Sequence, residues 1–93
     1  MKVLITEYVL STYHGDNSII DLMPEAIAMV RSLVRSLIAS GAYVGVTISP
    51  FISSSLLSIN GNVIRVDPHD YFDEVKRVSG DFDYVIAIAP PRE

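Results

Sequence analysis

The chain has 93 residues, 49% of them hydrophobic and 19% charged, which predicts one compact globular domain over residues 1–93. Its net charge of −4 argues against nucleic acid or an anionic membrane surface as the main partner. It has no cysteine, which excludes disulfides and thiolate metal sites. The sequence shows no signal peptide and no apolar run near the roughly 20 residues that span a bilayer, so we expect a cytoplasmic protein.

Four apolar segments are typical of β-strands. Residues 2–10 (KVLITEYVL) contain consecutive apolar side chains, a pattern that predicts a strand buried on both faces of a parallel sheet. Residues 43–49 and 62–66 predict a second and a third strand. Residues 84–89 (YVIAIA) predict a fourth strand, which we also expect to be buried on both faces.

A long amphipathic helix is predicted from Pro24 to the residues before Gly41. Proline suits the first helical position, and Glu25 in the first turn complements the helix dipole. Gly41 is well placed as the left-handed residue that ends the helix. The predicted buried stripe consists of Ile27, Val30, Val34, Leu37 and Ile38.

A second helix is predicted between the third and fourth strands. Asp67 is the expected N-cap, Pro68 the first helical residue and Asp70 the acid of a capping box. Gly80 ends this helix. The predicted buried stripe consists of Phe72, Val75 and Val78.

Two connections are less regular. Residues 11–21 (STYHGDNSIID) form a long polar segment after the first strand, and such loops are usually functional or disordered. Residues 53–59 fit either a short helical turn or one arm of a hairpin around Asn60-Gly61. We favour the helical turn, because the third strand must connect to a helix on a parallel sheet.

The alternation of strands and helices predicts an α/β fold with a three-layer parallel sheet of about four strands. Right-handed crossovers give the spatial strand order 3-2-1-4. We expect strands one and four to lie side by side at the centre of this sheet. Their carboxyl ends would bring residues 7–12 close to residues 90–93, at the edge where open α/β sheets bind ligands.

No catalytic or metal-binding motif stands out. The chain lacks a dinucleotide fingerprint, a phosphate loop and a spaced set of metal ligands. Glu7 is an acid inside an apolar strand, so it needs either a structural partner or a ligand. Ser11 and Thr12 have no identifiable base and are expected to form loop hydrogen bonds. His14 and His69 are expected to lie in solvent, which leaves no residue predicted as catalytic or metal-binding.

Three segments together resemble a known enzyme domain. They are LITEYVLST at 4–12, PEAIAMVRSLVRSLIASGAYVGV at 24–46 and DFDYVIAIAP at 81–90. Their order and spacing are similar to those of the Rossmann-like amino-terminal domain of ATP-grasp enzymes. The most similar group is that of predicted ATP-dependent carboligases related to biotin carboxylase and to the archaeal tyramine–glutamate ligase. The resemblance spans nearly the whole chain but only the first domain of such an enzyme.

The resemblance implies a function for the parent enzyme rather than for this chain alone. Such enzymes activate a small carboxylic acid as an acyl phosphate, which an amine then attacks. ATP and magnesium bind to further domains, so no cofactor is expected in this chain. The expected partners are those ATP-grasp domains, the acid and amine substrates, and in the isolated chain a second copy.

The resemblance also implies which residues face the substrates. By position these are Glu7, Tyr8, Ser11, Thr12, Glu25 and Pro90. The chain departs from the family pattern where Ala26 replaces a glycine, where Ser49-Pro50 replaces an acid, and where Ala89-Pro90-Pro91 replaces Ala-Pro-Glu. The alternative is a free-standing α/β module for ligand binding, regulation or dimerisation.

Overall fold

The computed structural model describes residues 1–15, 17–53, 55, 57–58 and 60–89. Its sheet consists of β1 (Lys2–Glu7), β2 (Tyr43–Ile48), β3 (Asn62–Arg65) and β4 (Tyr84–Ile88). All neighbouring strands run parallel, in the order β3-β2-β1-β4. The predicted α/β class and strand order are therefore confirmed.

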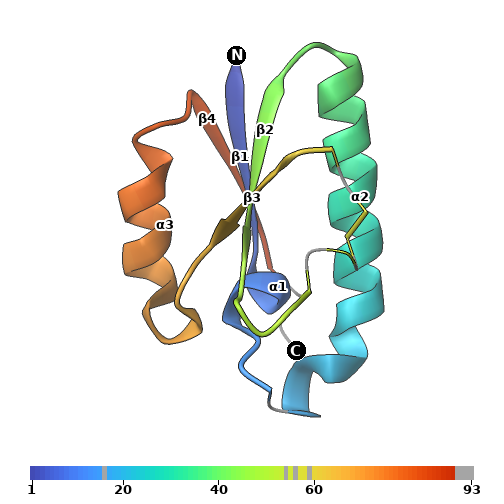
Figure 1. Ribbon diagram of the computed structural model, residues 1–93, viewed down its shortest axis with the longest axis vertical. Helices are drawn as coiled ribbons and strands as arrows, with labels where there is room; N and C mark the ends of the chain where they lie inside the picture. Colours follow the sequence, from blue (N-terminus) through green and yellow to red (C-terminus); the bar gives the residue numbers. More distant parts are fainter. Residues whose placement is uncertain (16, 54, 56, 59, 90–93) are drawn as a thin grey trace.

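The helices lie on both faces of this sheet and at one end of it. They are α1 (Tyr8–Thr12), α2 (Met23–Ala39) and α3 (Tyr71–Ser79), with 3-10 turns η1 (Asn17–Leu22) and η3 (Pro68–Asp70). Figure 1 shows α2 along one face, α3 along the other, and α1 at the carboxyl ends of the central strands. The result is the predicted three-layer arrangement.

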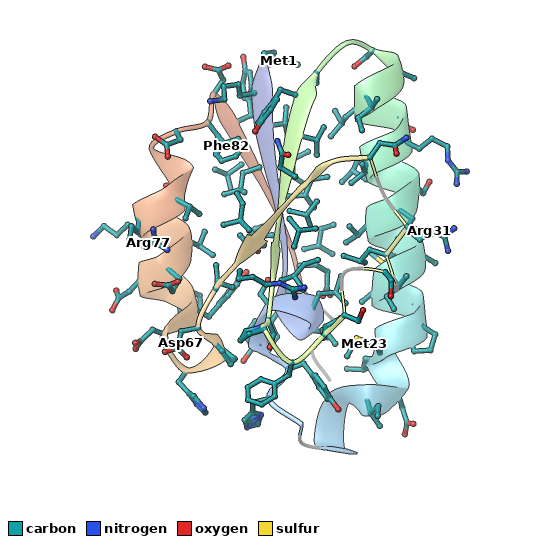
Figure 2. All side chains as sticks on the ribbon, viewed as in Figure 1. Met1, Met23, Arg31, Asp67, Arg77 and Phe82 are labelled. Carbon is teal, nitrogen blue, oxygen red and sulfur yellow. The ribbon has the colours of Figure 1, made fainter. Side chains whose placement is uncertain are left out.

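Helix α2 forms largely as its sequence predicts. Pro24 lies in its first turn, and Gly41 follows its end with a φ of 93°. Val30 and Val34 are buried against the sheet. On the opposite side, Arg31 projects away from the sheet, as Arg77 does from α3 (Figure 2). The other stripe residues, Ile27, Leu37 and Ile38, are partly buried and pack against the same core.

Strand β1 is shorter than predicted, because Glu7 starts a helix. The backbone N–H of Leu10 donates to Glu7 Oε1 at 2.7 Å, which makes Glu7 the N-cap of α1. Residues 8–10 are therefore helical rather than extended. The segment 11–21 contains the end of α1 and most of η1, so its prediction as one long loop was wrong.

The second predicted helix is divided into η3 and α3. Asp67 is the N-cap as predicted, since its Oδ1 accepts from the His69 N–H at 2.9 Å. The predicted capping role of Asp70 is wrong, because the Asp67 N–H points to Glu74 Oε2 at 3.4 Å. The 3-10 turn changes the helical phase before α3 begins at Tyr71.

This change of phase exposes Phe72, which was predicted to be buried. Tyr71 turns inward instead, and its hydroxyl lies 2.9 Å from Thr6 Oγ1. Phe72 is 78% exposed, whereas Val78 is buried as predicted and Val75 is half-buried.

Strand β4 lies at an edge of the sheet, and its prediction as a central strand buried on both faces was wrong. In the observed order β2 and β1 are the central strands. Tyr84 is 61% and Val85 43% exposed, and the rest of the strand is exposed or half-buried. An apolar run indicates a strand, but it does not distinguish a central strand from an apolar edge.

The alternatives for residues 53–59 fall partly on residues 54, 56 and 59, which lie outside the described residues. The strand that follows, β3, pairs in parallel with β2. Pro90 and the expected approach of residues 90–93 to residues 7–12 also lie outside the described part of the chain.

Candidate functional site

The carboxyl end of β1 places a buried acid beside α1. Glu7 is only 3% exposed. The sequence required a partner or a ligand for this carboxylate, and the first turn of α1 supplies a partner through Leu10. Burial raises the pKa of Glu7, and hydrogen bonds from the backbone of Leu10 and Val9 lower it by less. The protonated form of this side chain is therefore favoured relative to an exposed glutamate.

A pocket of about 170 Å³ opens between α2 and the carboxyl ends of β1 and β4. Two carboxylates, Glu7 and Glu25, belong to its lining. None of its lining residues carries a positive charge. The remaining lining is apolar and consists of Val9, Leu22, Ala26, Met29, Ile88 and Ala89. Such a lining suits a ligand with a cationic group and an apolar body.

A second pocket, of about 360 Å³, lies beside α1, η3 and α3. Its lining consists of Tyr8, Thr12, His14, Pro68, His69, Tyr71 and Phe72. The rings of His14 and His69 meet edge to face, with centroids 5.3 Å apart. Tyr8 and Tyr71 pack in the same manner at 5.5 Å. Aromatic and imidazole rings therefore dominate this pocket.

The histidine pair was missed in the sequence. His14 and His69 are distant in the chain, but each follows the carboxyl end of a parallel strand, β1 or β3. Carboxyl ends of parallel strands meet at one edge of the sheet, and that rule was the available signal. Two imidazoles are too few for a closed metal site, and the described residues contain no group of three side chains that could hold a metal ion.

A chain of hydroxyl groups connects α1 to α3 across β2 and β1, on the face of the sheet that α3 covers. Ser11 Oγ lies 2.8 Å from Thr47 Oγ1, which donates to Thr6 Oγ1 at 2.8 Å. Thr6 Oγ1 in turn lies 2.9 Å from the Tyr71 hydroxyl. Burial raises the pKa of Tyr71, while the hydrogen bond with Thr6 lowers it by less. Every buried polar side-chain atom among the described residues has a hydrogen-bond partner.

The predicted site residues are divided among these surroundings. Glu7 and Glu25 share the first pocket, whereas Tyr8 and Thr12 line the second. Thr12 Oγ1 donates to the carbonyl of Tyr8 at 2.6 Å. Ser11 is fully buried in the hydroxyl chain, so in this structure it presents no surface to a substrate.

The chain was compared with family models, curated proteins and solved structures. None of them matches it. In the part of the chain that the structure describes, no helix combines the length and the apolar character needed to cross a bilayer. The pockets and the resemblance of the three sequence segments are therefore the features that indicate a function.

Proposed function

We propose that this chain is the substrate-side domain of an ATP-dependent carboxylate–amine ligase of the ATP-grasp type. In this proposal the pocket between α2 and the ends of β1 and β4 receives the amine substrate. The observation that carries the proposal is that Glu7 and Glu25 share one otherwise apolar pocket at the sheet edge where α/β proteins bind ligands.

The two carboxylates would act differently on an ammonium group. Glu25 is exposed, so its negative charge is available at the surface to attract a cation from water. Glu7 is buried with a raised pKa, so a bound ammonium would favour its ionised form and release a proton. Met29 and Ile88 would contact the apolar body of the amine.

The ligase part of the proposal rests on the sequence resemblance. In that reading ATP and magnesium bind to domains other than this one, and the cell compartment is the cytoplasm. We therefore expect no measurable ATP binding or hydrolysis by residues 1–93, with or without magnesium. Calorimetry tests this expectation, and micromolar ATP affinity of the chain would contradict the division of labour.

The amine site can be tested on the chain itself by nuclear magnetic resonance titration. The probes are an arylalkyl primary amine and the neutral alcohol of the same shape. We expect the amine to shift resonances of Met29 and Ile88, and the alcohol to shift them far less. Equal responses to the two probes, or none to the amine, would overturn the amine site.

A matched pair of variants distinguishes attraction of the amine by the pocket carboxylate from attraction by the net charge of the chain. Glu25→Gln removes the exposed carboxylate of the pocket and should weaken the amine response about tenfold, since a cation loses its nearest accessible charge. Asp73→Asn removes an exposed acid from α3 and should leave the response unchanged. If both variants weaken the response equally, only the net charge of the chain attracts the amine.

A free-standing binding module is the second candidate, because this small domain already forms a pocket that contains two carboxylates. Such a module would bind the amine but would support no ATP-dependent ligation in any longer protein that contains it. In a ligase, Glu7→Gln should lower turnover and leave ATP affinity intact. Unchanged turnover and Michaelis constants would mean that Glu7 serves only as the N-cap of α1.

A further inference from the structure

The two edges of the sheet differ in their protection against strand pairing. Strand β3 is four residues long and ends in a charged residue, Arg65. Strand β4, YVIAI, contains no charge and no proline, although its side chains are largely exposed. Edge strands of soluble proteins usually carry charges, prolines or bulges that prevent pairing with another chain. Over Tyr84–Ile88, in the part of the chain that the structure describes, the open edge of β4 lacks such protection.

Among the described residues, the backbone of β4 also directs hydrogen-bonding groups without a partner to this open side. The Tyr43 N–H of β2 donates to the carbonyl of Met1, so the backbone N–H and C=O groups of the odd-numbered residues in β1 point toward β2. The backbone groups of the even-numbered residues Leu4 and Thr6 therefore point toward β4. Leu4 and Thr6 have Val85 and Ala87 as their register partners. In a parallel pair, such a residue forms hydrogen bonds with the two residues on either side of its register partner, not with the partner itself. The backbone N–H and C=O groups of Val85 and Ala87 therefore point away from β1, toward the open edge.

The strand is compatible with a second copy of itself. An antiparallel pair with its two-fold axis at Ile86 places Ile86 opposite Ile86 of the second copy. It joins Val85 to Ala87 of the second copy by reciprocal backbone hydrogen bonds. Tyr84 then lies opposite Ile88 of the second copy, on the side of the sheet that α2 covers. No like charges meet along Tyr84–Ile88, so the pairing carries no electrostatic cost there.

We propose that β4 is a self-association edge, at which two copies of this chain join into one continuous eight-stranded sheet. The apolar groove between α2 and β4, to which Met29, Leu33 and Ile88 contribute, receives side chains from the second copy next to the paired strands. A ladder of five residues buries less surface than the roughly 800 Å² per partner that is typical of stable complexes. We therefore expect a dissociation constant in the micromolar range. The inference does not rest on the proposed ligase, although the groove shares Met29 and Ile88 with the pocket proposed for the amine.

A charge exchange at Ile86 tests the two-fold pairing. Ile86→Lys places two ammonium groups opposite each other, and Ile86→Glu places two carboxylates there, at Cβ separations of about 5 Å. In sedimentation the parent should approach twice its mass of 10.2 kDa as its concentration rises. Each variant alone should remain monomeric, and an equimolar mixture should recover the dimer.

Phe72→Lys provides the control, because Phe72 is an exposed apolar residue on α3. This variant should dimerise like the parent. The proposal fails if the parent is monomeric at high micromolar concentration, if Ile86→Lys still dimerises, or if the mixture stays monomeric. Loss of the dimer in Phe72→Lys would place the interface elsewhere.

Amide hydrogen exchange keeps the test decisive if the Ile86 variants do not fold. In the parent, the outward amides of Val85 and Ala87 should become protected as the concentration rises. The amide of Phe72 lies in the first turn of α3 and should exchange at the same rate throughout. Exchange of Val85 and Ala87 that is independent of concentration would overturn the pairing.

Discussion

The two faces of the sheet are held by different kinds of interaction. On the α2 face, aliphatic side chains from β1, β2 and α2 form one continuous core. On the α3 face, Leu4 and Val78 are buried, but the hydroxyl chain from Ser11 to Tyr71 crosses the same layer. Aliphatic packing is non-directional, whereas hydrogen bonds fix the positions of the groups that they join. The comparison indicates that non-directional packing holds α2 and α1 on one face, whereas on the other face hydrogen bonds help to fix α3 relative to β1.

Substitutions at two neighbouring residues of β1 should have the largest effect on stability, and they test whether the two faces differ. Ile5 and Leu4 are both fully buried, and they point to opposite faces. Each substitution by alanine should cost about 2–5 kcal/mol, as is typical of large-to-small changes in a core. Ile5→Ala should cost more, because the well-packed α2 face is less able to close the cavity. Denaturant unfolding measures both costs, and a larger cost for Leu4→Ala would reverse the assignment.

The hydroxyl chain gives the next effect. Thr47→Val keeps the shape of the side chain but removes its hydroxyl from the middle of the chain. We expect a cost of about 1 kcal/mol, because Thr6 keeps Tyr71 as a partner and Ser11 keeps the carbonyl of Thr47. Tyr71→Phe should cost a similar amount.

The double variant Thr47→Val/Tyr71→Phe distinguishes a connected chain from separate bonds. It leaves Thr6 Oγ1 without either side-chain hydroxyl partner, so its cost should exceed the sum of the single costs. Chemical unfolding of the four proteins provides the cycle. Additive costs would show that the bonds act independently.

The Glu7 carboxylate gives a smaller and pH-dependent effect. Because burial raises the pKa of Glu7, the stability that it contributes is present below its unfolded value of 4.5 and is lost as the pH rises through the folded pKa. Glu7→Gln keeps an oxygen that accepts from Leu10 but has no charge. The melting temperature of the variant relative to the parent should therefore rise between pH 4 and pH 7.

Calorimetry at several pH values measures this difference. Because the variant and the parent are compared at each pH, effects of pH on the rest of the chain cancel in the difference. A relative melting temperature that falls with pH in Glu7→Gln would mean that the ionised carboxylate stabilises α1 by more than its burial costs.

The smallest effect is expected at the start of α2. Pro24 lies in the first turn, where a backbone N–H has no helical partner. Pro24→Ala should change the free energy of unfolding by well under ~1 kcal/mol and leave the core below α2 intact. A larger loss of stability in chemical unfolding would show that the proline ring itself fixes the entry into α2.

Much of the fold could be predicted because the local signals were strong. The helical period of α2, its proline and Gly41 placed that helix, and the crossover rule gave the strand order. Helix α1 was not predictable from propensity, because its start depends on the Glu7 carboxylate capping residues that otherwise favour a strand. The phase of α3 depends on the 3-10 turn before it, which the pattern of Phe72, Val75 and Val78 does not contain.

The site was predictable only in part, for a geometric reason. The sequence predicted that Glu7 lies near the carboxyl end of the first strand and Glu25 in the first turn of the long helix, and the structure has both residues there. The sequence could not show that Ser11 turns into the sheet, since this orientation depends on α1. Nor could it show that His14 and His69 meet, because their contact depends on how η3 packs beside α1.

The pairing of β1 with β4 has a consequence for the order of folding. The Lys2 N–H donates to Asp83 Oδ2, and the Asp83 N–H donates to the carbonyl of Lys2, both at 2.8 Å and across 81 positions of sequence. Contacts between distant residues slow folding, since a long loop must close before they form. During synthesis β1 can pair with β2 early, but its other edge stays unpaired until β4 has been made. Until then an apolar central strand has one open edge, and that interval is when the nascent chain is most exposed to aggregation.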